Sequence, residues 1–168
     1  MSVNFKAAVV MGSDSDFPVL KKTIQLLKEF NIKTEVHVIS AHRTPGRAES
    51  FAKNAQAEGI GVIIAAAGKA AHLAGVLASH TVLPVIGLPI HSSTLDGLDA
   101  LLSTVQMPKG VPVATVAING AENAALLAVQ ILSLANPELK VKLQEYKDKM
   151  AREVEEKDLV IKEEVGQI

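Results

Sequence analysis

The sequence contains no cysteine and no tryptophan, and aromatic residues make up only 3% of its 168 residues. Without cysteine there is no disulfide, no thiolate nucleophile and no cysteine-ligated metal. Four phenylalanines and one tyrosine are too few for the stacked rings that bind single-stranded nucleic acid. The formal net charge of −1 gives no general attraction to phosphate polymers or acidic membranes. We therefore expect no nucleic-acid or membrane partner, and only local recognition of phosphate.

Long hydrophobic runs are also missing. No apolar run reaches 18 residues, and no basic N-terminal region precedes an apolar segment. These absences predict no membrane span and no signal peptide, so a cytoplasmic protein is expected. The five histidines are not spaced as ligands on one helix face, and no carboxylate cluster joins them, so no metal site is expected. We interpret His37, His80 and His91 as structural.

What the chain does have is a regular alternation of two kinds of segment. Hydrophobic residues at 48% and charged residues at 21% predict one compact domain over residues 1–168. Short apolar runs predict strands at 7–11, 34–39, 62–66, 84–88 and 113–117. Helical spacing predicts helices over 18–31, 45–58, a short segment ending near 80, 97–104, 119–136 and 137–163. The last of these is amphipathic, and we interpret it as a packing helix, within the subunit or against a neighbour.

Strands that alternate with helices predict an α/β fold, in which a doubly wound parallel sheet carries helices on both faces. With five strands, the order 2-1-3-4-5 is the expected arrangement. The turns after strands 1, 2 and 3 then converge where the winding reverses, which is where open α/β sheets bind ligands. These turns carry the most unusual polar residues of the chain: Ser13, Ser15, Asp16, Ser40, His42, Arg43, Gly68, Lys69 and His72. Their convergence predicts a ligand site.

The first of these turns, residues 12–16, combines backbone N–H groups and hydroxyls at the start of a helix, which suits an anion. It lacks the Gly-Lys-Ser/Thr ending of a phosphate-binding P-loop and the three spaced glycines of a dinucleotide site. Asp16 can accept hydrogen bonds from two ribose hydroxyls. The alternative is that Ser15 or Asp16 merely caps the helix.

The second turn, residues 40–45, places a titratable imidazole beside a permanent cation. His42 has the ring type that transfers protons near neutral pH, and Arg43 can bind a phosphate with its guanidinium fork. The alternatives are a structural histidine and a surface salt bridge. Pro45 suits the first turn of a helix, and we expect the Thr44 hydroxyl to cap that helix.

The third turn is built from small residues, with alanine at 66–67, Gly68, and alanine at 70–71. Without large side chains, the backbone can approach a small ligand closely. The alternative is a tight strand-to-helix turn that happens to use small residues.

Taken together, these motifs closely resemble class I PurE, the N5-carboxyaminoimidazole ribonucleotide mutase of bacterial purine synthesis. The resemblance is carried, in the same order, by residues 11–16, 40–45, 70–73, 97–99, 105–108 and 112–115. It covers about residues 6–150. The tail beyond is not diagnostic.

This resemblance implies a flavodoxin-like subunit that assembles as a homo-octamer, with active sites at subunit interfaces. It implies an isomerase that uses no metal or organic cofactor and acts on a small ribonucleotide, with His42 transferring the proton. Ser13 and Asp16 would bind the ribonucleotide, Arg43 its phosphate, and Ala67, Gly68 and His72 would border the pocket for the migrating carboxyl group. The remaining substrate-binding residues implied are Gly12, Ser15, Ser40, Ala41, Lys69 and Leu73.

Lys69 stands where this family commonly has a second glycine. Its ammonium would either add a positive charge near the substrate carboxylate or point outward, and outward is the favoured interpretation. Two other functions stay open: a carboxylase that joins free carbon dioxide to aminoimidazole ribonucleotide, and a non-catalytic nucleotide-binding module, because a fold alone does not determine function.

Overall fold

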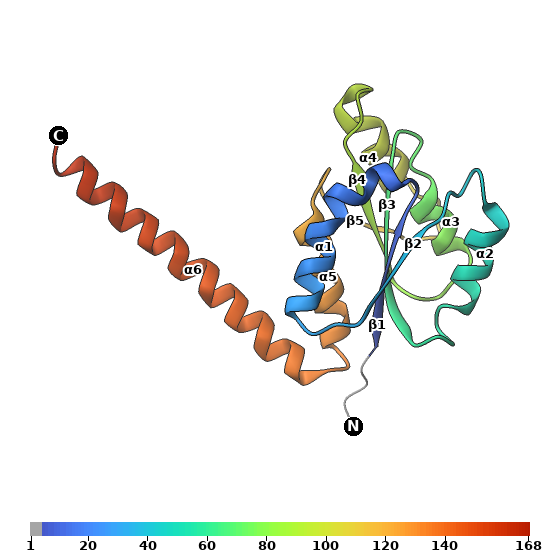
Figure 1. Cartoon of the computed structure of the whole chain (residues 1–168), viewed down its shortest axis with the longest axis horizontal. Coiled ribbons are helices and arrows are strands. Elements are labelled where there is room, and N and C mark those ends of the chain that lie inside the picture. Colours follow the sequence, from blue (N-terminus) through green and yellow to red (C-terminus); the bar gives the residue numbers. More distant parts are fainter. Residues whose placement is uncertain (1–4) are drawn as a thin grey trace.

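The computed structural model describes residues 5–168 (Figure 1). Its five strands are β1 Lys6–Met11, β2 Thr34–Val38, β3 Ile60–Gly68, β4 Val85–Ile90 and β5 Ala114–Thr115. They form one all-parallel sheet in the order β2-β1-β3-β4-β5, which confirms the predicted topology.

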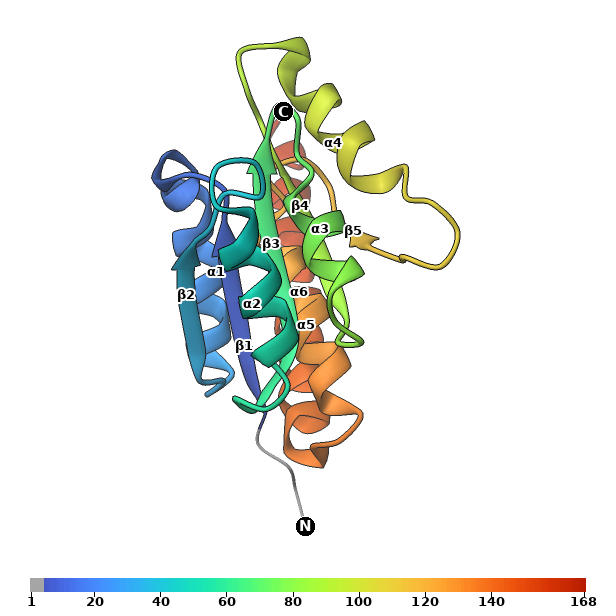
Figure 2. The same cartoon turned by 90° about the vertical axis from the view of Figure 1, so that its right-hand side faces the viewer.

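Helices cover both faces of this sheet, as Figures 1 and 2 show. They are α1 Phe17–Glu29, α2 Pro45–Asn54, α3 Leu73–Ser79, α4 Leu98–Val105, α5 Ala121–Ser133 and α6 Pro137–Val165, with 3-10 turns η1 Asp14–Asp16 and η2 Leu95–Gly97. Helices α1 and α5 lie on one face, and α2 and α3 lie on the other. Within residues 5–168, no helix combines the length and apolar character needed to cross a lipid bilayer.

The central strands are apolar on both sides because both sides are buried. In β1, Val9 and Met11 face the core under α1 and α5, whereas Ala8 and Val10 face the core under α2 and α3. All four are at most 2% exposed. Because the sheet is covered on both faces, the sequence of each central strand is a continuous apolar run and not an alternation of apolar and polar residues.

Several element boundaries differ from the prediction by one to four residues, and two of them have a clear physical reason. Helix α2 ends at Asn54 and not near 58, because Ile60 N–H donates to the Ala55 carbonyl (3.0 Å) and Gly59, at φ +81°, turns the chain into β3. Strand β5 keeps only two of the five expected residues. It pairs with β4 alone, so nothing on its outer side extends the ladder.

Helix α6 packs on the body only through its first turns. Leu139 is buried, and Leu143 and Tyr146 pack against the same core, where the Tyr146 ring lies 5.8 Å from that of Phe30. Every residue after Tyr146 is exposed, and the helix projects away from the sheet as an arm (Figure 1). The predicted packing role within the subunit thus holds for the start of the helix only.

Candidate active site

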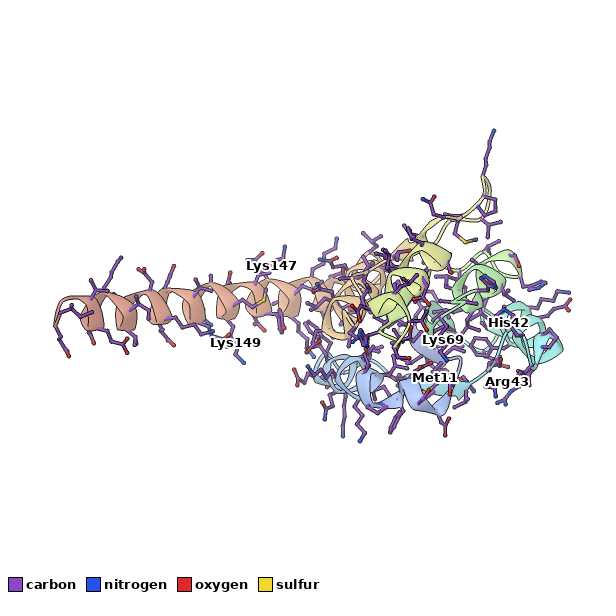
Figure 3. The ribbon with its side chains drawn as sticks, turned by 90° about the horizontal axis from the view of Figure 1, so that it is seen from above. Met11, His42, Arg43, Lys69, Lys147 and Lys149 are labelled. Carbon is purple, nitrogen blue, oxygen red and sulfur yellow. The ribbon has the colours of Figure 1, made fainter. Side chains whose placement is uncertain are left out.

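A cavity of about 500 Å³ opens at the carboxyl edge of the sheet, above β1, β2, β3 and β4. Figure 3 looks onto this edge from above and labels His42, Arg43 and Lys69 there. The cavity is lined by Gly12, Ser13, Ser15, Asp16, Ser40, Ala41, His42, Arg43, Ala67, Gly68, Lys69, Ala70, Leu73, Ile90, His91 and Ser92. Of the thirteen predicted site residues, only His72 is outside this lining. The three loops expected to converge do converge.

The loop after β1 is organised by Ser13. Its hydroxyl oxygen accepts the Ser15 backbone N–H (3.3 Å), and its own N–H donates to Oδ2 of Asp16 (3.2 Å), which together form a capping box. The alternative considered above, in which Ser15 or Asp16 merely caps the helix, is therefore not seen: Ser13 is the cap of this turn. Ser13 has extended backbone and lies directly before the turn, so its side chain is the one that reaches the unpaired N–H groups.

Asp16 is the one buried carboxylate in this lining, with 6% of its surface exposed. Burial raises the pKa of Asp16, while hydrogen bonds from the Ser13 N–H and the Ser15 hydroxyl act in the opposite direction. The same two bonds hold the carboxylate in a fixed orientation. A carboxylate oriented at the cavity wall is suited to accept hydrogen bonds from sugar hydroxyls.

The loop after β2 is closed by Thr44. Its hydroxyl donates to the Ser40 carbonyl (2.9 Å) and accepts the Ser40 N–H (3.1 Å). The expectation that Thr44 caps α2 is thus wrong: its oxygen bonds back into the loop, and no side-chain cap bond is formed.

Arg43 is held by the same loop. Its backbone N–H and its Nε both lie within reach of the Ser40 hydroxyl oxygen, at 3.2 and 3.5 Å. Among the described residues it forms no ion pair, so the surface salt bridge considered as an alternative is not seen. An exposed guanidinium at the cavity rim is well suited to bind a phosphate group.

His42 contacts the loop after β3. Its Nε2 lies 2.9 Å from Nδ1 of His72, and the two rings meet edge to face at 79° with centroids 5.0 Å apart. His72 lines a neighbouring groove with Gly75, Val76 and Met107, and it reaches the cavity only through His42.

The small-residue loop after β3 forms the remaining wall. A Cβ added to Gly68 would lie 3.3 Å from the Ile90 carbonyl oxygen, which is a tight contact, so the approach of β3 to the end of β4 favours glycine there. Lys69 lies in the left-handed region at φ +56°, which explains physically why glycine is the common residue at this position in the resembling family.

The end of β4 supplies cavity residues that were not predicted, Ile90, His91 and Ser92. His91 is about half exposed, and its Nε2 lies 3.5 Å from Oδ1 of Asp96. Its structural role stays a prediction, while the cavity lining also includes His91. Its position directly after a strand next to β3 was the available signal. That signal was missed because no recognisable motif surrounds His91.

These groups can bind a phosphorylated sugar and move one proton on a group attached to it. The described residues include no cluster of three or more histidines or carboxylates that could hold a metal ion. The polar set is instead the His42–His72 imidazole pair, the His91 imidazole, one guanidinium, one ammonium, one buried carboxylate and several hydroxyls.

Comparison with known proteins gives a consistent match. The family model described as AIR carboxylase matches residues 6–153. The chain is 60% identical over 149 residues to the N5-carboxyaminoimidazole ribonucleotide mutase of Pyrococcus horikoshii, covering 89% of the chain and 84% of that protein. It is 58% identical over 152 residues to the mutase of Thermotoga maritima, covering 90% and 89%. The crystal structure of Treponema denticola PurE matches with a TM-score of 0.83 at 31% identity, covering 90% and 95%.

Proposed function

The chain belongs to the AIR carboxylase family, and from this we propose that it is an isomerase of purine biosynthesis that converts N5-carboxyaminoimidazole ribonucleotide to 4-carboxyaminoimidazole ribonucleotide. The observation that carries the proposal is the position of His42. Its imidazole lies in one cavity with Asp16, Ser13 and Arg43, at the edge where the sheet reverses its winding. One site thus offers partners for the sugar and the phosphate of a ribonucleotide, together with a group that can transfer a proton.

Substrate binding is assigned to the loops after β1 and β2. Ser13 and Asp16 bind the ribose, where the oriented carboxylate accepts two hydroxyl hydrogens, and Arg43 binds the phosphate. Gly12, Ser15, Ser40 and Ala41 complete this side of the cavity. The Arg43 guanidinium gives this site a local positive charge, although the chain as a whole has a formal net charge of −1.

The reaction requires the enzyme to donate one proton to the substrate and later to accept one proton from it. His42 donates a proton to the carbamate nitrogen of the substrate while the bond from nitrogen to the carboxyl carbon breaks, which releases carbon dioxide within the cavity. Carbon 4 of the substrate ring then attacks that carbon dioxide, and His42 takes the proton that carbon 4 must lose. Atoms and charges balance without a redox partner, because the carboxyl group moves within one molecule.

Carbon dioxide must stay in place between the two steps. We assign its pocket to the loop after β3, where Ala67, Gly68 and Leu73 form the wall, with Lys69 beside them. Small side chains let the backbone close around a three-atom molecule. Holding it against carbon 4 replaces a bimolecular collision by a positioned reaction.

An isomerisation assay tests this function. Purified protein is given the carbamate substrate, and its conversion is followed spectroscopically with and without added bicarbonate. A mutase works equally well in both. A carboxylase acting on aminoimidazole ribonucleotide would instead depend on bicarbonate, and protein that binds the ribonucleotide without turnover would be a non-catalytic module.

We further propose that the enzyme is a cytoplasmic homo-octamer, as the resemblance to class I PurE implies. The described surface offers apolar side chains for such contacts: Val36 and Val38 on β2, and Leu98, Leu102 and Val105 on α4, are all at least 43% exposed. Light scattering should give eight times the subunit mass of 17.7 kDa. A subunit-sized particle would refute the assembly and leave the reaction to be tested separately.

A further inference from the structure

The contact between His42 and His72 couples two loops through their ring nitrogens. Nε2 of His42 and Nδ1 of His72 are 2.9 Å apart, which is hydrogen-bond distance. Such a bond needs a hydrogen on one nitrogen and a lone pair on the other. Two N–H groups facing each other would repel, so one proton is shared across this contact. The tautomer of one ring therefore determines that of the other.

His72 is placed to act on His42 and not on the substrate. It lines the groove beside the cavity, with Gly75, Val76 and Met107, and is absent from the cavity lining itself. Among the described residues, no other hydrogen bond reaches the His42 ring. With Nε2 engaged by His72, Nδ1 is the nitrogen of His42 that remains for proton exchange.

We propose that His72 is a positioning residue, which accepts the Nε2–H of His42 at its own Nδ1 and thereby holds the orientation and tautomer of the His42 ring. The proposal rests on the proposed function of His42 and deepens it. It also differs from the role implied by resemblance, in which His72 borders the carboxyl pocket.

The hydrogen bond has a defined task in each half of the reaction. The protonated His42 ring gives its Nδ1 proton to the carbamate nitrogen and keeps the Nε2 proton, which stays in the bond to His72. The neutral ring then presents a lone pair at Nδ1, and this lone pair takes the proton from carbon 4. One proton leaves and one returns at the same atom, and His72 remains neutral throughout.

Two substitutions separate this role from simple packing. In His72→Asn the side-chain carbonyl oxygen occupies roughly the place of Nδ1 and can still accept the His42 proton, whereas His72→Leu offers no acceptor. We expect His72→Leu to lower kcat about 10-fold to 100-fold with little change in KM, a smaller loss than the roughly 10²-fold to 10⁴-fold that the proton-transfer group itself contributes. His72→Asn should recover most of the loss. His80→Asn, at the opposite end of α3 and outside the cavity lining, is the matched control.

The tautomer is read directly by nuclear magnetic resonance of protein labelled with ¹⁵N in its histidines, without substrate. We expect a scalar coupling between Nε2 of His42 and Nδ1 of His72, with the proton attached to His42, and its loss in His72→Leu. A proton on Nδ1 of His72, or no coupling, would overturn the proposal. So would equal kcat values for the two variants, or a change in KM alone. Inactive wild-type protein would instead refute the proposed function, because the resonance measurement does not depend on turnover.

Discussion

At the scale of single residues, the cavity combines groups with very different solvent access. Asp16 is buried and held by two hydrogen bonds, whereas His42 and Arg43 stand exposed on a neighbouring loop. The buried group is fixed before any ligand arrives. A ligand that fills the cavity removes water from the exposed groups, and their charges then interact more strongly.

Replacing His42 with asparagine should remove the proton-transfer group and keep the fold. The side chain is exposed, and its contact with His72 is a single hydrogen bond worth about 1 kcal/mol. We expect His42→Asn to lower kcat about 10²-fold to 10⁴-fold with an unchanged circular dichroism spectrum and particle mass. A near-normal rate in this variant would remove His42 from the mechanism, and His80→Asn serves again as the control.

Replacing Asp16 with asparagine should weaken substrate binding and flatten part of the pH dependence of stability. The folded-state pKa of Asp16 is raised, mainly by burial, so its stabilising contribution is complete below pH 3.8 and is lost as pH rises through the folded pKa. Asp16→Asn keeps an oxygen for the Ser13 N–H but cannot ionise. Its Tm relative to wild type should therefore rise as the pH increases from below 3.8 through the raised folded-state pKa of Asp16.

The binding effect of Asp16→Asn is measured separately. Loss of charge-assisted hydrogen bonds to the ribose should raise KM about 10-fold or more. A Tm difference that stays constant with pH would contradict the assigned burial effect, and an unchanged KM would remove Asp16 from the ribose site.

At the scale of elements, the site depends on how closely the helices approach the sheet. Helix α4 lies against β4, where Gly87 leaves room for it. A Cβ on Gly87 would lie 2.3 Å from Cγ2 of Thr104 and 2.9 Å from Cγ1 of Val113. Thr104 is buried and bonded to the Ala100 carbonyl (2.7 Å), so it cannot rotate away without losing that bond.

Gly87→Ala should consequently destabilise the protein by about 1–3 kcal/mol, the usual cost of overpacking a core. Urea denaturation measures this. Gly46→Ala is the matched control, because nothing lies within 4 Å of a Cβ at that position in α2. There the substitution should stabilise by up to about 1 kcal/mol through helix propensity. Equal effects of the two changes would show that α4 packs less tightly than described.

At the scale of the whole molecule, a compact α/β body carries a long, charged arm (Figure 1). The base of α6 belongs to the core through Leu139, Leu143 and Tyr146. Farther out, apolar side chains such as Val154 and Ile161 are more than half exposed. The outer part of α6 therefore receives little stabilisation from packing against its own subunit.

Two truncations separate the contribution of α6 to subunit stability from its contribution to assembly. Ending the chain after Pro137 removes the core contacts and should lower Tm as well as disturb assembly. Ending it after Arg152 leaves those contacts in place, so Tm at low concentration should be kept while the particle mass by light scattering falls. An unchanged mass after both truncations would contradict a role of α6 in association.

The fold and most of the cavity were accessible from the sequence because they depend on local pattern. Continuous apolar runs such as residues 7–11 signal buried parallel strands, and the doubly wound order places the turns after strands 1, 2 and 3 together. Twelve of the thirteen predicted site residues line the cavity for this reason. Their roles in binding and catalysis remain predictions until variants are measured.

By itself, the sequence determined the strand order, the converging loops and the family, since each follows from periodicity or from a contiguous motif. Only the tertiary structure decided that His42 bonds to His72, that Thr44 closes its own loop, that His91 joins the cavity, and that α6 leaves the body after Tyr146. Such features depend on the distances between residues that are far apart in the chain, or on which of two nearby groups a side chain bonds to. Local pattern does not contain that information.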